Sequence, residues 1–173
     1  MNDVLFILVL LFPFVFFLHE MEELSSQRRW INTYKDNLGA NNPRVKAIFD
    51  KMVGFNTKAF SVAIAEEFLV VAFVTAYFLL NGAFAKYLWL AVFIAYSAHF
   101  FMHVVQAMAV RGYVPGLVTA VVCLPYANFA VLCMAVSEPK VSILPLLLCA
   151  ALGYVFWFYN HRFAHALGSR LCK

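Results

Sequence analysis

Residues 4–23 read VLFILVLLFPFVFFLHEMEE, and this stretch decides the fold class. Val4 to Leu18 carries no charge, which is typical of a helix that crosses the ~30 Å hydrocarbon core of a bilayer with about 20 residues. One histidine and three glutamates then follow within residues 19–23, with no glycine or proline to end the helix. The segment therefore predicts a membrane helix that carries ionisable side chains to one face of the bilayer.

The composition of the whole chain supports this prediction. Its 173 residues are 64% hydrophobic with a mean hydropathy of +0.80, and 13% are charged, against about 25% in soluble domains. A water-soluble fold of this size could not bury so much apolar surface. The composition predicts a polytopic membrane protein, and Asp3 in place of a basic leader predicts that the first segment is retained rather than cleaved.

Five apolar segments have the length of a membrane-spanning helix. A helix satisfies its own backbone hydrogen bonds, which lipid cannot do, so helices are the expected structure. The predicted fold class is all-α: an integral membrane bundle of about five transmembrane helices that form one membrane domain over residues 1–173. The predicted spans are 3–23, 60–80, 87–110, 116–136 and 141–159.

Lysine and arginine predict the orientation of the bundle. With the loop 24–59 in the cytoplasm, eleven basic residues lie inside and only Lys86 and Lys140 lie outside. This distribution follows the positive-inside rule and predicts an external N-terminus and a cytoplasmic C-terminus. The net charge of +4 is explained by topology, so no nucleic-acid partner is expected. The small size and the charge asymmetry favour a bacterial inner membrane.

The loop 24–59 is predicted to contain a short amphipathic helix. Asn42 suits an N-cap, Pro43 suits the first helical position and Gly54 suits the stop. Between them apolar residues recur at helical spacing, and basic residues take the other face. The pattern predicts a helix that anchors the loop at the cytoplasmic interface, with a lid over a site as the alternative.

Ionisable side chains also interrupt the second and third spans. Glu66 and Glu67 lie within AFSVAIAEEFLVVAF, and His99 and His103 lie within YSAHFFMHVVQ. A charge deep in a membrane helix costs about 3 kcal/mol on insertion scales, so such residues are functional candidates by default.

The depths of these groups agree. Glu66 lies eight residues past Lys58, and His103 lies eight residues before Arg111, so each is roughly 12 Å from the same membrane edge. His19 lies at a comparable level. Three helices that run in alternating directions are therefore predicted to bring their ionisable groups to one layer.

Helical spacing predicts which of these side chains share a face. His19, Glu22 and Glu23 are related by i+3 and i+4, whereas Glu20 points elsewhere and is expected to be solvated. The two histidines of the third span also share a face. The adjacent glutamates of the second span diverge by about 100°, so which of them faces the site stays open.

A metal site explains the gathered groups. Carboxylates alone would repel one another, and some would have to stay protonated. A divalent cation neutralises glutamates and binds imidazole nitrogens, and mixed Glu/His sets suit zinc, iron or manganese. One or two ions are expected, by analogy with di-iron carboxylate bundles. The predicted ligands are His19, Glu22, Glu23, Glu66, Glu67, His99 and His103.

Structural alternatives exist for each motif. The HEMEE segment alone is also typical of a helix end whose acidic residues are solvated at the interface. The histidines of the third span could be a neutral pair bonded to neighbouring helices. His161 and His165 repeat the i, i+4 spacing, but they lie at the charged C-terminal end, where a snorkelling interfacial segment is expected.

The chain resembles the membrane protein family named for its HXXEE motif. The motif is His19-Glu20-Met21-Glu22-Glu23, and it is followed in order by the 66–67 glutamate pair, the His99-x-x-x-His103 stripe and the Tyr113-x-Pro115-Gly116 turn. The resemblance covers about residues 10–130. It implies a small multi-span membrane protein and brings no activity with it.

The residues therefore have to carry the prediction of function. The expected protein is a metalloenzyme that acts on a lipid or another apolar small molecule by hydrolysis or oxidation, in the cytoplasmic half of the bilayer. Metal-bound water would be the nucleophile and one of Glu22, Glu23, Glu66 or Glu67 the proton acceptor. Two alternatives stay open: a proton- or metal-ion transporter or channel that uses the same carboxylates, and a non-catalytic membrane partner subunit. A homo-oligomer is compatible with each.

Overall fold

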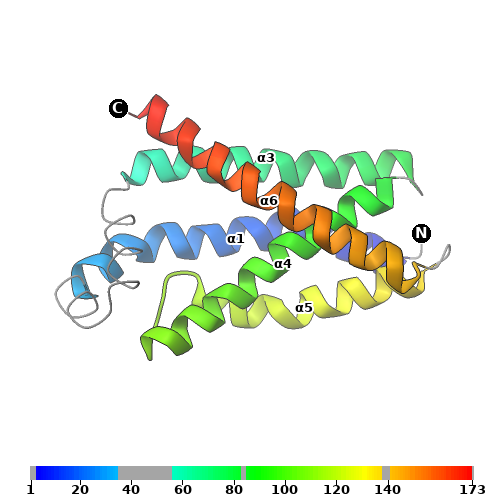
Figure 1. Ribbon diagram of the computed structural model, residues 1–173, viewed down its shortest axis with the longest axis horizontal. Coiled ribbons are helices and arrows are strands. Elements are labelled where there is room, and N and C mark those ends of the chain that lie inside the picture. Colours follow the sequence, from blue (N-terminus) through cyan, green and yellow to red (C-terminus); the bar gives the residue numbers. More distant parts are fainter. Residues whose placement is uncertain (1–2, 35–55, 83–84, 138–140, 173) are drawn as a thin grey trace.

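The computed structural model describes residues 3–34, 56–82, 85–137 and 141–172. Within those ranges five helices form the structure, each long and apolar enough to cross a membrane, which confirms the predicted all-α bundle (Figure 1). The amphipathic helix predicted between Asn42 and Gly54 lies outside the described residues. The helices are α1 (Asp3–Tyr34), α3 (Thr57–Asn81), α4 (Ala85–Val110), α5 (Leu117–Val136) and α6 (Ile143–Leu171).

Two helices extend well past the predicted spans. α1 continues through the HEMEE segment to Tyr34, and α6 continues to Leu171, whereas the sequence predicts spans that end at residues 23 and 159. The 32 residues of α1 reach about 48 Å, far more than a ~30 Å hydrocarbon core requires. Residues 24–34 contain no glycine or proline, so the helix outlasts its apolar part. The end of the apolar run is therefore not the end of the helix.

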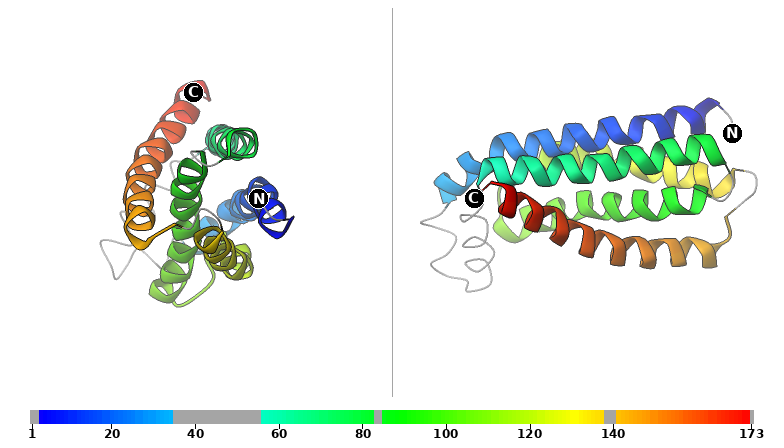
Figure 2. Two further views of the ribbon diagram at one scale, coloured as in Figure 1. Left: turned by 90° about the vertical axis from the view of Figure 1, so that its right-hand side faces the viewer. Right: turned by 90° about the horizontal axis from the view of Figure 1, so that it is seen from above.

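α4 occupies the centre of the bundle. Figure 2 shows it between α6 on one side and α1, α3 and α5 on the other, and it packs against α3, α5 and α6 along its backbone. It also contacts α1 through side chains, described below. This central place makes α4 the helix most able to present side chains to several partners at once.

Aromatic side chains hold α1 against α4. Phe12 of α1 meets Phe93 edge-on at a ring separation of 4.7 Å, and Phe16 meets Tyr96 edge-on at 4.9 Å. Trp89 stacks on Phe93 at 4.4 Å. Such pairs contribute about 0.5–1.5 kcal/mol each beyond burial. They fix α1 and α4 relative to each other about one helical turn from His19 and His99.

Two glycines let α6 approach its neighbours closely. A Cβ atom on Gly153 would overlap the backbone carbonyl of Ala91 in α4, and one on Gly168 would overlap that of Ala59 in α3. Small residues at helix contacts are the usual means of close packing in membranes. His161 and His165 lie between these two glycines on α6. The two close contacts therefore fix the position of both histidines along and around the helix axis.

Candidate metal centre

Two helices supply a compact group of four metal-ligating side chains. His19 and Glu23 lie one turn apart on α1, and His99 and His103 lie one turn apart on α4, so each pair projects from one helix face. The four ligand atoms all lie within 4.8 Å of one another. We call His19, Glu23, His99 and His103 the histidine cluster.

The imidazole nitrogens converge on a single point. Nε2 of His103 lies 3.2 Å from Nε2 of His19 and 3.0 Å from Nε2 of His99. The Glu23 carboxylate lies 3.7 Å from Nε2 of both His99 and His103. Zinc–nitrogen bonds of 2.0–2.1 Å in a tetrahedron separate the ligand atoms by about 3.3 Å. The histidine cluster could therefore hold a metal ion.

Burial divides the cluster into a closed side and an open side. His19 is fully buried and His103 is 3% exposed. The side chains of His99 and Glu23 are 18% and 16% exposed. A small molecule would thus reach an ion between these groups from the side of His99 and Glu23.

Glu22 lies beside the histidine cluster and faces the start of α5. Its carboxylate accepts hydrogen bonds from the backbone N–H groups of Val118 (3.2 Å) and Thr119 (2.6 Å). It also accepts from the hydroxyls of Thr119 (2.5 Å) and Tyr113 (2.8 Å). The N-cap residue Gly116 offers no side chain, so Glu22 satisfies the first amides of α5, where a negative charge is stabilised.

The contacts of Thr119 determine which nitrogen of His19 carries a proton. Thr119 Oγ1 donates its proton to the Glu22 carboxylate at 2.5 Å, in preference to the Gly116 carbonyl at 3.3 Å. The oxygen therefore accepts at 2.9 Å from Nδ1 of His19. A neutral imidazole carries one proton, so Nε2 of His19 keeps its lone pair. That nitrogen is the atom aimed into the histidine cluster.

The turn between α4 and α5 covers the buried side of the cluster. Gly116 has a φ of 80°, and a Cβ there would lie 2.9 Å from Cε1 of both His19 and His103. Tyr113 is held from both directions, because its carbonyl accepts from Nε1 of Trp30 at 2.6 Å and its hydroxyl donates to Glu22. Burial raises the pKa of Tyr113, so this hydroxyl keeps the proton it donates. The Tyr113-x-Pro115-Gly116 motif of the sequence is thus part of the site.

Glu66 and Glu67 lie outside the histidine cluster and face α6. Nδ1 of His161 lies 3.0 Å from the Glu67 carboxylate, and the side-chain amide of Asn160 donates to Glu66 at 3.1 Å. The His161 ring also stacks on Trp157. The sequence predicts a snorkelling interfacial segment here, and the side chain of His161 is 38% exposed although it contacts Glu67. Its i, i+4 relation to His165 was the available signal for that contact.

The exposure of Glu20 also differs from the prediction. The sequence predicts a solvated side chain, but Glu20 is only 3% exposed. Its carboxyl lies within electrostatic range of those of Glu23 and Glu67. We call Glu20, Glu66, Glu67, Asn160 and His161 the acidic cluster.

The seven predicted ligands therefore divide into three environments. The structure brings four together, in the histidine cluster. Glu22 is engaged by α5 through Thr119, one hydrogen bond from His19. Glu66 and Glu67 belong to the acidic cluster.

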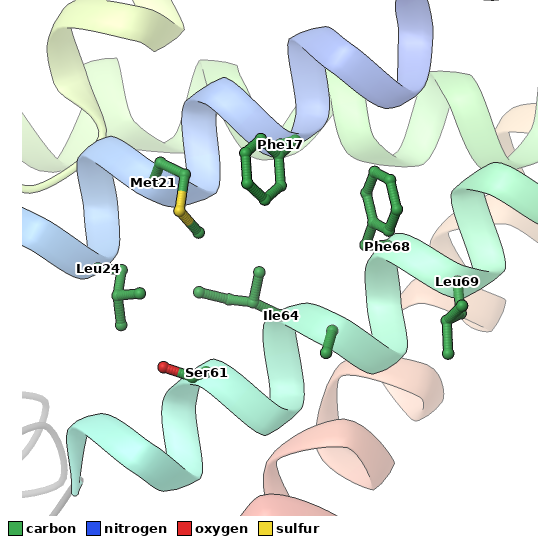
Figure 3. Close-up of a pocket in the computed structure, with 8 residues that line it drawn as sticks. Phe17, Met21, Leu24, Ser61, Ile64, Phe68 and Leu69 are labelled. Atoms are coloured by element: carbon green, nitrogen blue, oxygen red, sulfur yellow. The ribbon is translucent and has the colours of Figure 1, made fainter.

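An apolar groove lies between α1 and α3 on another side of the bundle (Figure 3). Its volume is about 400 Å³, and α1 contributes Phe17, Met21 and Leu24 to its wall. These residues follow i, i+4, i+7 and share one helix face. His19 and Glu23 point more than about 100° away from that face. The groove is therefore no entrance to the histidine cluster.

Comparison with protein families gives one match to the chain. The model of a family described as "Protein of unknown function with HXXEE motif" matches residues 10–130. Those residues include α1 from its second turn, all of α3 and α4, and most of α5. Neither curated proteins nor solved structures give a match.

Proposed function

The chain belongs to the HXXEE-motif family, whose function is unknown, and from the site itself we propose that it is an integral membrane metalloenzyme. The convergence of three imidazole Nε2 atoms beside a carboxylate carries this proposal. Three neutral imidazoles cannot satisfy one another through nitrogens that all point to one centre, because each has a single proton to donate. A cation at that centre satisfies all three at once.

The surroundings of His19 support the same conclusion. Metal-binding histidines usually donate their other ring nitrogen to a neighbouring group, which fixes the tautomer and the ring orientation. Here Thr119 and Glu22 serve that purpose, and they do so from a different helix. A histidine needed only for helix packing would require no such arrangement.

Chemistry at the site would use Glu23. A bound divalent ion supplies Lewis acidity and lowers the pKa of a coordinated water to about 7. Glu23 lies farther from the imidazole nitrogens than they lie from one another, and it faces the open side. It is the carboxylate placed to accept a proton, since Glu22 is engaged by four donors. With zinc held by the histidines, the site would support hydrolysis of a lipid or another apolar ester; with iron, Glu23 would help to hold the metal and the site would support oxygen chemistry.

The proposed location is the cytoplasmic half of a bacterial inner membrane. The end of α1, the start of α3 and the end of α6 lie at one end of the bundle, and the start of α4 lies at the other (Figure 1). The first three carry Arg28, Lys58 and Arg170, and the start of α4 carries Lys86. The positive-inside rule then orients the first end toward the cytoplasm. Substrate would enter from the inner leaflet on the side of His99 and Glu23.

Elemental analysis of the purified protein tests the site. We expect one equivalent of zinc, iron or manganese per chain, lost in His99→Ala/His103→Ala. The matched control is His161→Ala/His165→Ala, which removes a second i, i+4 histidine pair and should keep the metal. Two equivalents would show that Glu67 and His161 bind an ion as well. A protein without metal, or equal loss in both variants, would contradict the proposal.

Transport is a second candidate function, favoured by the acidic cluster. Glu20 lies within electrostatic range of Glu23 and Glu67, and Glu67 contacts His161, so ionisable groups occur on α1, α3 and α6. Such groups are typical of proton and cation pathways. Metal or proton flux into proteoliposomes that Glu67→Gln abolishes would favour this function over catalysis.

A further inference from the structure

We propose that the groove between α1 and α3 binds one acyl chain of an anionic phospholipid, whose phosphate lies against Arg28 and Lys58. This inference is independent of the proposed metalloenzyme activity, because the groove lies on a different face of α1 from the histidine cluster. It concerns a resident lipid and not the substrate.

The shape and lining of the groove suit a single apolar chain. It measures about 400 Å³, and among the described residues Ser61 provides the one polar side chain in its wall (Figure 3). At the end of the groove away from Arg28 and Lys58, Phe17 of α1 meets Phe68 of α3 edge-on at a ring separation of 5.8 Å. This contact joins the two helices there. At the other end the wall is formed by Leu24 and Ser61, and the helices continue beyond it.

Helical register places the two basic residues at the open end. α1 and α3 run in opposite directions, and Figure 3 shows Met21 across from Ile64 and Leu24 across from Ser61. One further turn on each helix brings Arg28 level with the start of α3, where Lys58 lies.

Both basic residues also belong to the faces that form the groove. Phe17, Met21, Leu24 and Arg28 follow i, i+4, i+7 and i+11 along α1. On α3, Lys58 precedes Ser61 by three residues on the same stripe. Arg28 and Lys58 are exposed, and within the described ranges neither forms an ion pair.

These features identify the ligand class. An apolar slot parallel to the helices takes an acyl chain, and two cations that form no ion pair with a described residue take a phosphate at its mouth. A zwitterionic lipid carries its own cation next to the phosphate, so it would gain less binding free energy from Arg28 and Lys58. A free phosphate would not use the slot at all.

Lipid retention measured by native mass spectrometry tests the proposal. The full-length protein in detergent would be titrated with phosphatidylglycerol and with phosphatidylcholine of identical acyl chains. We expect one tightly held phosphatidylglycerol per chain and weaker retention of phosphatidylcholine. Arg28→Gln/Lys58→Gln should weaken phosphatidylglycerol binding by roughly fivefold per charge, about 25-fold in total.

Two further variants separate the slot from general surface charge. Arg29→Gln/Arg170→Gln removes the same charge from exposed positions outside the groove and should leave retention unchanged. Ala65→Phe fills the groove and should release the lipid while both cations remain. Metal content should be unchanged in all three, which shows that each variant is folded and keeps this test apart from that of the metal centre.

Several outcomes would overturn the proposal. Equal retention of the two lipids would do so, as would equal loss in the two charge variants or unchanged binding in Ala65→Phe. A dimer that Ala65→Phe dissociates would assign the groove to a second copy of the chain instead.

Discussion

Replacement of Glu22 tests whether metal binding depends on the orientation of His19 as well as on the residues that bind the ion directly. In Glu22→Gln the amide can no longer accept four hydrogen bonds, and Thr119 is released to donate to Nδ1 of His19. The His19 proton then moves to Nε2, which removes a lone pair from the histidine cluster. We expect metal affinity to fall about 10–100-fold in a competition titration with a chelator.

Glu66→Gln is the matched control for that substitution. It removes the same charge from a carboxylate whose one hydrogen bond among the described residues is from Asn160. Its metal affinity should stay close to that of the wild type. Equal affinities in all three proteins would mean that Glu22 has no part in positioning His19.

Gly116 is required both by the local backbone conformation and by the space that His19 and His103 occupy. Gly116→Ala places a Cβ at a φ of 80° and against Cε1 of both His19 and His103. Gly82→Ala is the matched control, because Gly82 also has a positive φ, of 64°, but nothing lies within 4 Å of its Cβ. Backbone strain should cost each variant about 1–3 kcal/mol. Thermal unfolding should show both losses, and elemental analysis should show loss of metal in Gly116→Ala alone; metal retained there would contradict the contact.

At the scale of the helix, α6 is held by close contact at glycine. Gly168→Ala should push α6 away from α3, because the new Cβ would overlap the Ala59 carbonyl, at a cost of about 1–3 kcal/mol. The metal should be retained, since α1 and α4 supply the histidine cluster. Thermal unfolding and elemental analysis of the same sample check both expectations.

Gly112→Ala serves as the control for this contact. Its Cβ would meet only the Tyr34 hydroxyl, at an ordinary 3.5 Å, so little change in the unfolding temperature is expected. If Gly168→Ala unfolds at the wild-type temperature, the tight approach of α6 to α3 is wrong.

The helix is also the scale at which sequence reasoning succeeds and then stops. The i, i+4 spacing predicts that His19 shares a face with Glu23, and His99 with His103. Their similar depths predict that the two pairs meet, and the structure has all four in one group. Spacing cannot tell which neighbour a face meets. Whether Glu22 turns to α5, or Glu67 to α6, depends on how helices cross, and those crossings depend on contacts such as Gly153 and Gly168 that join distant parts of the chain.

At the scale of the whole molecule, the composition was sufficient to predict five apolar helices and their all-α packing. It was not sufficient for their lengths, because the polar extensions of α1 and α6 carry no apolar signal. The buried position of Glu20 was missed for a related reason: a charged residue near a span end is expected in water, and its burial depends on helix packing that the sequence does not show.

The orientation of the bundle yields a prediction for the intact protein in cells. A green fluorescent protein fused after residue 173 should fluoresce, because that reporter folds in the cytoplasm and the basic loops favour a cytoplasmic C-terminus. Alkaline phosphatase fused at the same position should be inactive. An active phosphatase fusion with a dark fluorescent fusion would reverse the topology and move the histidine cluster to the outer leaflet.

The separation of the ligands along the chain has a consequence for biogenesis. His19 and His103 are 84 residues apart, and the hydroxyl that orients His19 lies 100 residues beyond it. A nascent chain with only its first two helices in the bilayer presents one imidazole and has no means of fixing that imidazole's tautomer. Loading with the proposed ion would then wait until α5 has left the translocon, so we expect a cell short of that ion to accumulate fully inserted, apo protein rather than chains stalled midway through insertion.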